Sequence, residues 1–171
     1  KDCSGLTSIT ITDNVTSIGE EAFNRCTSLK DVHISNIATW CRISFDGYHA
    51  NTLSYAHNLY LNDSLITNLI IPGGVSRIGE FTFSGCKNLS DVYCPATVIP
   101  NLYSSAFSST PIESATLHVP DTCVEAYRKA DGWSGFGRIV SLLDKPYLTF
   151  VDGGKLWNTG IMADDEFLKQ Y

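Results

Sequence analysis

The sequence has few basic residues and no long apolar run. Its 171 residues include 12 Lys and Arg against 18 Asp and Glu, a formal net charge of −6. Because surplus positive charge is what neutralises phosphates, this balance excludes a non-specific nucleic-acid binder and disfavours adsorption to anionic membranes. No apolar run reaches the ~18 residues that a membrane-spanning helix needs, so we expect no membrane insertion by this segment. Hydrophobic residues still make up 43% of the chain, enough to build a core.

The sequence also lacks the short motifs of common enzymes and metal sites. It holds no phosphate loop, zincin helix, nucleophile elbow or Cys-x-x-Cys pair. His49 and His57 lie eight residues apart (57 − 49), which is not a zinc-ligand spacing on a helix. A cysteine-nucleophile enzyme built on Cys41 and these histidines is an alternative, but Cys41 follows Trp40 in an apolar turn typical of a buried, inert thiol. We therefore predict no enzymatic activity, no metal and no cofactor.

The dominant feature of the sequence is an internal repeat. Residues 3–35 slide onto residues 63–95 without a gap, and 12 of the 33 aligned pairs are identical. Ordinary composition gives roughly two or three identities by chance. A weaker third copy begins at Ala106-Phe107 and ends over residues 117–120. Because one unit this short cannot bury its own apolar face, we expect stacked units that share a continuous core.

The repeat has a simple physical interpretation. Apolar and polar residues alternate over Leu6–Ile11, which predicts a short, half-buried strand. Two sets of residues recur at a fixed phase and are expected in the core: the phenylalanines Phe23, Phe83 and Phe107, and the cysteines Cys3, Cys26 and Cys86. Since inward side chains of stacked turns run parallel, these cysteines have poor disulfide geometry and are predicted to be core thiols.

The repeating residues resemble a known family. Leu-x-x-Ile-x-Ile followed by Val-x-x-Ile-Gly-x-x-Ala-Phe-x-x-Cys-x-x-Leu runs over residues 6–29, and nearly the same pattern returns over Thr67–Val92. It is similar to the BspA-like leucine-rich repeats of bacterial surface proteins. The resemblance covers residues 3–143 and implies an α/β leucine-rich-repeat solenoid, right-handed and β-rich with short helical turns. It also implies a location at the cell surface or outside the cell, and partners among host or matrix proteins. Asn14 is replaced by Gly74 in the second copy, so no continuous asparagine ladder exists.

The chain is predicted to divide after the repeats. Residues 117–140 resemble the family's terminal cap, and a capping-box pattern at Thr122–Glu125 predicts a C-terminal helix that covers the stack. We therefore expect a solenoid domain at residues 1–143. Residues 144–171 predict a β-hairpin followed by a short helix at the acidic residues 164–166. This second part is either a tail packed on the cap or the start of a following module.

Residues 36–62, between the first two copies, form an enlarged and divergent repeat. A helical turn is expected at residues 37–41 and a strand at residues 59–61. The segment is rich in aromatic and histidine rings, and three of these residues define an alternative binding loop: Tyr48, His49 and Tyr55.

The residues that point outward from the main strands are the first candidate for a binding surface. Because strand side chains alternate, the residue between the last two inward positions faces solvent, and in-register stacking turns these residues into one stripe. The stripe comprises Thr10, His33, Tyr60, Ile70, Tyr93 and His118. Planar rings with polar tips suit protein or sugar recognition, so the predicted binding residues are His33, Tyr60, Tyr93 and His118. Aromatic and β-branched residues favour strands in any case, so strand composition alone is the competing interpretation.

Together these observations predict a monomeric, non-catalytic, adhesin-like module that engages a protein or glycan through its solenoid surface. One alternative is a structural spacer within a larger cell-surface protein, and another is an enzyme or an enzyme accessory domain. A large exposed aromatic patch favours the first, a uniformly small polar surface favours the second, and a pocket with converging titratable groups favours the third.

Overall fold

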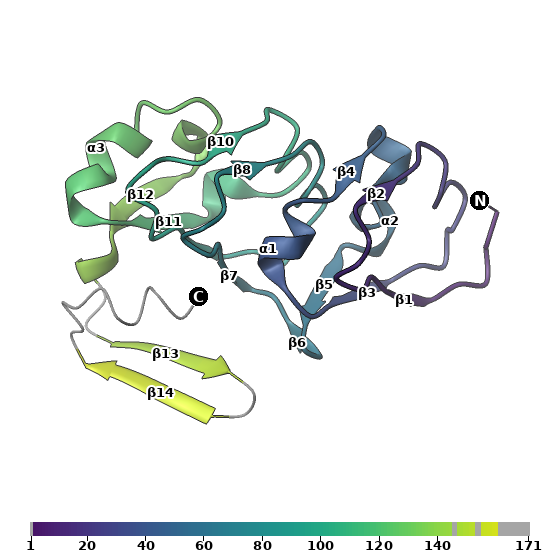
Figure 1. Ribbon diagram of the computed structural model, residues 1–171, viewed down its shortest axis with the longest axis horizontal. Coiled ribbons are helices and arrows are strands. Elements are labelled where there is room, and N and C mark those ends of the chain that lie inside the picture. Colours follow the sequence, from purple (N-terminus) through teal and green to yellow (C-terminus); the bar gives the residue numbers. More distant parts are fainter. Residues whose placement is uncertain (1, 145–146, 153–154, 161–171) are drawn as a thin grey trace.

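The computed structural model shows short strands stacked side by side along the length of the molecule (Figure 1). It describes residues 2–144, 147–152 and 155–160. The strands are β1 (Ser8–Thr10), β2 (Ser17–Ile18), β3 (Asp31–Ile34), β4 (Ser44–Phe45), β5 (Asn58–Leu61), β6 (Ser64–Leu65), β7 (Asn68–Ile70), β8 (Arg77–Ile78), β9 (Asp91–Tyr93), β10 (Asn101–Leu102), β11 (Thr116–Val119), β12 (Arg138–Ser141), β13 (Tyr147–Asp152) and β14 (Lys155–Gly160).

Helical elements between the strands are short. The α-helical turns are α1 (Ile37–Trp40), α2 (Leu53–Ala56) and α3 (Val124–Tyr127). The 3₁₀ turns are η1 (Tyr48–Ala50), η2 (Ile112–Ser114), η3 (Asp121–Cys123), η4 (Trp133–Gly135) and η5 (Leu142–Asp144). Within the described ranges, no helix is long and apolar enough to cross a membrane.

The main strands form two four-stranded sheets, β1-β3-β5-β6 and β7-β9-β11-β12. Pairing is parallel throughout except between β5 and β6. The register pairs Ser8 with Asp31 and Asn68 with Asp91, and both pairs lie 23 residues apart (31 − 8 and 91 − 68). The same 23-residue step separates the two recurring cysteines Cys3 and Cys26 (26 − 3), so one step of the repeat places an equivalent residue on the next strand.

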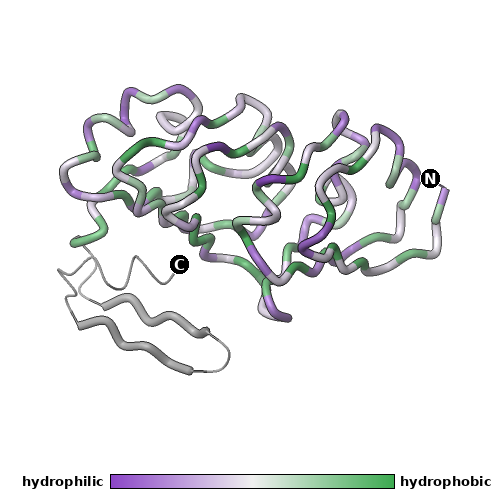
Figure 2. The backbone as a smooth tube through the Cα atoms, in the orientation of Figure 1, coloured by the Kyte–Doolittle hydropathy of each residue, from purple (hydrophilic) through white to green (hydrophobic). Residues whose placement is uncertain are grey.

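A second, narrower set of strands accompanies the main sheets. The two-residue strand β2 pairs with β4, and β8 pairs with β10, again in parallel. Hydrophobic stretches recur in the stacked strands from one end to the other (Figure 2). Their side chains form one cluster of buried residues that runs from Ile11 to Ile139.

The enlarged repeat joins the two main sheets. Its first turn, α1, begins where the Asn36 side chain accepts hydrogen bonds from the backbone of Ala38 and Thr39, at 2.8 and 3.2 Å. The predicted strand at residues 59–61 lies within β5. After β5 the chain turns back as β6, so within the described residues no strand pairing connects β5 to β7.

Side chains of the enlarged repeat instead bind the backbone of the second copy. Trp40 Nε1 donates to the Thr82 carbonyl at 2.9 Å, and the fully buried Asn51 donates to the Ser84 carbonyl at 2.9 Å. His57 Nδ1 lies 3.2 Å from the Gly85 carbonyl oxygen. Gly85 has φ +85°, and a Cβ there would lie 2.6 Å from the Leu53 carbonyl oxygen, so this junction requires glycine.

The phenylalanines confirm the repeat phase of the second and third copies. Phe83 and Phe107 are buried, and their rings stack with centroids 5.3 Å apart. Phe23 packs against the core but is only partly buried. The residue two positions after each phenylalanine has a left-handed backbone: Arg25 (φ 63°), Gly85 (φ 85°) and Ser109 (φ 59°). A shared and uncommon backbone conformation shows that the weak third copy makes the same turn.

The cysteines follow the predicted phase with one correction. Cys26 and Cys86 are free, buried thiols. Cys3 is exposed, so its prediction as a core thiol is wrong. Cys3 lies in the first described turn of the stack, and no described turn covers it. Cys26 lies in a later turn that further turns follow.

The end of the array is closed mainly by aromatic side chains. The predicted C-terminal helix is present only as α3, four residues long, and its start has no side-chain cap. Tyr127 and Trp133 are fully buried, and the angle between their rings is 80°. The Tyr127 hydroxyl donates to the Ala96 carbonyl at 3.0 Å, and Trp133 Nε1 donates to the Pro100 carbonyl at 2.9 Å. Two large rings fixed by hydrogen bonds fill this end, so a longer helix is not needed to cover it.

The predicted hairpin is present as β13 and β14, which pair antiparallel from Tyr147–Gly160 to Asp152–Lys155. The predicted helix at residues 164–166 lies outside the described residues. The domain boundary between residues 143 and 144 stays a prediction.

Candidate functional site

The outer face of the first sheet carries a stacked pair of rings. The register places Thr10, His33 and Tyr60 in one row across β1, β3 and β5. The His33 and Tyr60 rings lie 4.7 Å apart between centroids and only 10° from parallel. The His33 side chain keeps 28% of its surface exposed, and Tyr60 is also partly exposed. The structure therefore brings together two of the four predicted binding residues on an accessible face.

A carboxylate lies beside this pair. Asp63 Oδ1 accepts a hydrogen bond from His33 Nδ1 at 3.2 Å, and the Asp63 side chain is 93% exposed. Asp63 and its neighbour Asn62 both have positive φ, in the tight turn between β5 and β6. This turn brings the carboxylate back over the sheet, where sequence reasoning did not place it. Leu65 of β6 is also exposed and pairs with Tyr60 in register.

A row of polar side chains runs parallel to the rings. Asn58 Nδ2 donates to Asp31 Oδ1 at 3.0 Å, and Asn88 Nδ2 donates to Asn58 Oδ1 at 2.8 Å. These bonds tie β3, β5 and the segment before β9 together, across the break between the two sheets. Side-chain hydrogen bonds, as well as strand pairing, therefore hold together the segments next to the His33–Tyr60 pair.

The second sheet has an equivalent pair that is not accessible. Ile70, Tyr93 and His118 share one row, and the Tyr93 and His118 rings stack at 4.4 Å and 11°. Tyr93 is only 5% exposed and His118 only 2%. The prediction that all four rings form one exposed stripe is therefore wrong for these two. Alternation places a side chain on a face of the sheet but does not determine what packs over that face.

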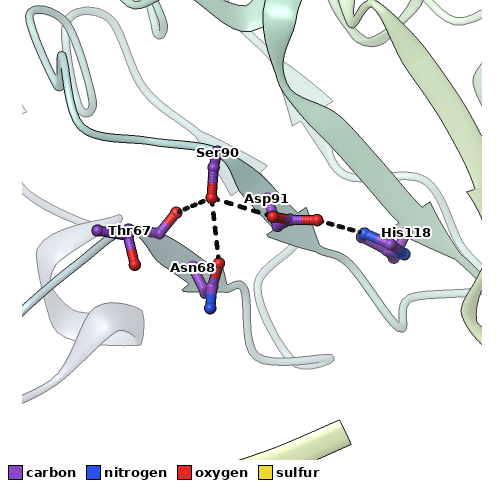
Figure 3. Close-up of polar contacts among 5 residues, drawn as sticks. All are labelled: Thr67, Asn68, Ser90, Asp91 and His118. Carbon is purple, nitrogen blue, oxygen red and sulfur yellow. Dashed lines mark hydrogen bonds and ion pairs between the residues drawn. The ribbon is translucent and has the colours of Figure 1, made fainter. Parts of the chain in front are cut away.

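His118 belongs to a polar network that crosses three strands (Figure 3). Its Nε2 donates to Asp91 Oδ1 at 2.8 Å. The Ser90 hydroxyl lies 3.0 Å from Asp91 Oδ2, 3.2 Å from the Thr67 carbonyl and 3.3 Å from Asn68 Oδ1. One hydroxyl proton can serve only one of these acceptors at a time.

The chemistry of this network is structural. A serine nucleophile needs its hydroxyl on the imidazole, which the carboxylate then orients. Here the Ser90 hydroxyl contacts the carboxylate, and the imidazole contacts the other oxygen of the same carboxylate. The histidine is therefore not placed to take the serine proton, and the network serves to hold neighbouring strands in register.

The alternative binding loop also forms a cluster. Tyr48 packs edge-on against His49 at 5.5 Å and is 45% exposed. The Tyr55 hydroxyl lies 3.5 Å from His49 Nδ1 and accepts from the Arg25 amide at 3.4 Å. Phe81 adds a fourth ring, 6.0 Å from Tyr48.

Phe81 was missed by sequence reasoning. It has φ +59°, an outlier for a bulky residue. The signal that could have found it is its place in the repeat, because Phe81 stands where the first copy has Glu21.

The buried thiols do not fit a nucleophile. Cys41 is 1% exposed, and burial, with a smaller contribution from nearby Cys94, raises the pKa of its thiol to about 12. Burial also raises the pKa of Cys86 to about 12. The predicted burial of Cys41 is confirmed. In the part of the chain that the structure describes, no group of three or more His, Cys, Asp or Glu side chains could hold a metal ion.

Comparison with known proteins identifies the repeats. A family model described as the BspA type leucine rich repeat region, in six copies, matches residues 1–60 and 54–129. No curated protein matches the chain.

Proposed function

The chain belongs to the BspA-type leucine-rich repeat family, and from this premise we propose that it is a non-catalytic extracellular binding module that engages a protein or glycan partner through its solenoid surface. Repeats of this type are commonly protein-binding modules of the cell surface and are generally non-catalytic. We further propose that the parallel stack winds as one right-handed solenoid and that the chain acts as a monomer. The parallel register of successive repeat units supports this winding.

The observation that carries the proposal is the accessible His33–Tyr60 stack. Two planar rings held 10° from parallel lose little conformational entropy when a partner covers them. Asp63 supplies hydrogen-bond acceptors at the edge of the stack, and Leu65 supplies apolar surface. A rigid aromatic platform with a polar rim is the usual composition of a recognition surface.

The test is a binding assay with three matched serine variants. Labelled Tyr60→Ser, Tyr48→Ser and Val98→Ser chains are applied to a panel of immobilised matrix proteins, a glycan array and host cells. Val98 is 84% exposed and lies in the C-terminal half, so its variant is the control for loss of exposed apolar surface. We expect Tyr60→Ser alone to weaken binding about tenfold, the loss typical of an interface residue that contributes more than 1 kcal/mol.

Other outcomes distinguish the alternatives. If only Tyr48→Ser weakens binding, the site is the loop of Tyr48, His49 and Tyr55. If the parent chain binds none of the probes, the spacer function replaces the binding function. Circular dichroism of each variant shows whether a loss of binding reflects a loss of fold.

A further inference from the structure

A cavity of about 210 Å³ lies in the C-terminal half of the molecule, away from the His33–Tyr60 stack. Its apolar floor is formed by Leu102, Phe107 and Ile112, and its rim includes Ser108, Ser109 and Glu113. Leu102 and Phe107 are largely buried, whereas Ser109 and Glu113 are exposed. The cavity is smaller than the ~300–1,000 Å³ of sites for drug-sized ligands, so it suits a single side chain.

The charge at the rim is negative. Glu113 is the one ionisable carboxylate among the lining residues, and no lysine or arginine lines the cavity. Among the described residues, Glu113 has no ion pair and the hydroxyls of Ser108 and Ser109 have no hydrogen bond. One lining residue, Tyr103, has a basic neighbour: the Arg77 guanidinium lies over its ring at 6.0 Å from the centroid.

A second cavity shows that this polarity is local. About 430 Å³ in volume, it is lined by Arg128, Arg138 and Phe136 and has no acidic lining residue. Two depressions on the same half of the molecule therefore have opposite charge, and only the smaller one presents a carboxylate above an apolar floor.

We propose that the smaller cavity binds a lysine side chain of a protein partner. The methylene stem of lysine packs well on an apolar floor while its ammonium group stays at the polar edge. That ammonium group has three N–H donors, and the rim offers the Glu113 carboxylate and two serine hydroxyls as acceptors. The net charge of −6 favours approach of a basic partner by long-range attraction. This site is independent of the binding surface proposed above.

The test uses amide NMR spectra of the full chain and two small probes that share one four-carbon stem. Nα-acetyl-lysine methylamide is titrated in parallel with Nα-acetyl-norleucine methylamide, which keeps the stem and lacks the ammonium group. We expect the lysine probe alone to shift the amide signals of Ser108, Ser109 and Gly132, with a dissociation constant on the order of 1 mM. Added salt should weaken this binding.

Matched variants test the role of the carboxylate. Glu113→Gln should weaken binding of the lysine probe about tenfold, the effect of losing one charge-assisted hydrogen bond. Glu20→Gln, the same change at an exposed position in the N-terminal half, should leave it unchanged. Both substitutions are at exposed sites, and the rest of the spectrum reports whether the fold is kept.

Four outcomes overturn the proposal. They are the absence of local shifts with the lysine probe, equal binding of the norleucine probe, unchanged binding in Glu113→Gln, and preferential shifts of the same amides by methyl glycosides. The last result identifies a sugar site. Because these probes do not use the adhesion assay, failure here is separable from failure of the proposed function.

Discussion

The two main sheets carry the same pair of rings in opposite environments. In β1-β3-β5-β6, His33 stacks on Tyr60 and both remain partly exposed. In β7-β9-β11-β12, His118 stacks on Tyr93 and both are buried. Each histidine donates to an aspartate, Asp63 in one case and Asp91 in the other, but Asp63 comes from a turn and Asp91 from a neighbouring strand.

This difference shows that the repeat determines where a side chain lies in its turn, whereas the segments packed next to it determine how far it is buried. Phe23 and Phe83 occupy the same phase, yet Phe23 is only partly buried while Phe83 is fully buried and stacks on Phe107. Equal residues at equal phase are therefore expected to contribute unequally to stability. The N-terminal sheet keeps rings at its surface, where a partner can reach them, and the C-terminal sheet uses them for packing.

The largest expected effect comes from truncating the two equivalent phenylalanines. Phe83→Ala should lower the free energy of unfolding by about 3–5 kcal/mol, because burial is lost and a cavity remains. Phe23→Ala should cost clearly less, because Phe23 is only partly buried. Urea denaturation monitored by circular dichroism measures both. Equal losses would show that burial in the stack does not control the energetics.

The next effect separates the two tyrosines. Tyr93→Ser should lower the free energy of unfolding by about 1.5–3 kcal/mol, the value of a buried aromatic side chain. Tyr60→Ser should leave stability within about 0.5 kcal/mol, as usual at the surface. The same denaturation experiment measures the pair. A stability loss in Tyr60→Ser as large as in Tyr93→Ser would mean that the two sheets do not differ as described.

The third effect concerns alkaline pH and two cysteines of one repeat phase. Burial raises the pKa of Cys86 from 9.0 to about 12 in the folded chain. The folded state therefore keeps a proton that the unfolded state loses, and stability, fully present below pH 9, falls as pH rises from 9 towards 12. At pH 10 the fall is about 1 kcal/mol for this thiol.

Substitution isolates that contribution. Cys86→Ala should reduce the loss of stability between pH 8 and 10, whereas Cys3→Ala, which removes the exposed thiol of the same phase, should not. Denaturation curves at several pH values measure the slope. An unchanged slope in Cys86→Ala would contradict the burial of its thiol.

The smallest effect is expected at the first strand. Ile9 of β1 is only partly buried, whereas its counterpart Leu69 of β7 is 1% exposed. Amide hydrogens of Ser8–Thr10 should therefore exchange about tenfold faster than those of Asn68–Ile70, since poorly covered strands open more often. Hydrogen-exchange mass spectrometry of the folded chain measures this. Equal protection would indicate that β1 is covered on both sides.

Sequence periodicity predicted the parts of the fold that depend on local alternation. The predicted in-register stripe placed Thr10 beside His33 and Ile70 beside Tyr93, as the register of β1 with β3 and of β7 with β9 does, and the repeat predicted the phase of Phe83 and Phe107. The His33–Tyr60 pair followed from the same register. These features need only the fixed step between repeats and the two faces of a strand.

What the sequence did not predict depends on contacts between distant segments. The burial of Tyr93 and His118, the exposure of Cys3 and the aromatic closure by Tyr127 and Trp133 all depend on what lies next to each residue. The cavity beside Glu113 combines residues of three segments, and a repeat pattern carries no signal for such a meeting. The capping-box pattern at Thr122–Glu125 also predicted a side-chain cap that α3 does not have.

The break between β5 and β7 has a mechanical consequence. Within each sheet, a ladder of backbone hydrogen bonds shares the tension along the stack. At the junction between the sheets, the tension passes instead through four side chains and the core contacts around them. These side chains belong to Trp40, Asn51, His57 and Asn88. Pulling on the two ends of the stack should therefore part the molecule at this junction before either sheet unravels, and single-molecule force spectroscopy would show two successive steps. If the junction yields first, each half of the molecule keeps its own pair of stacked rings.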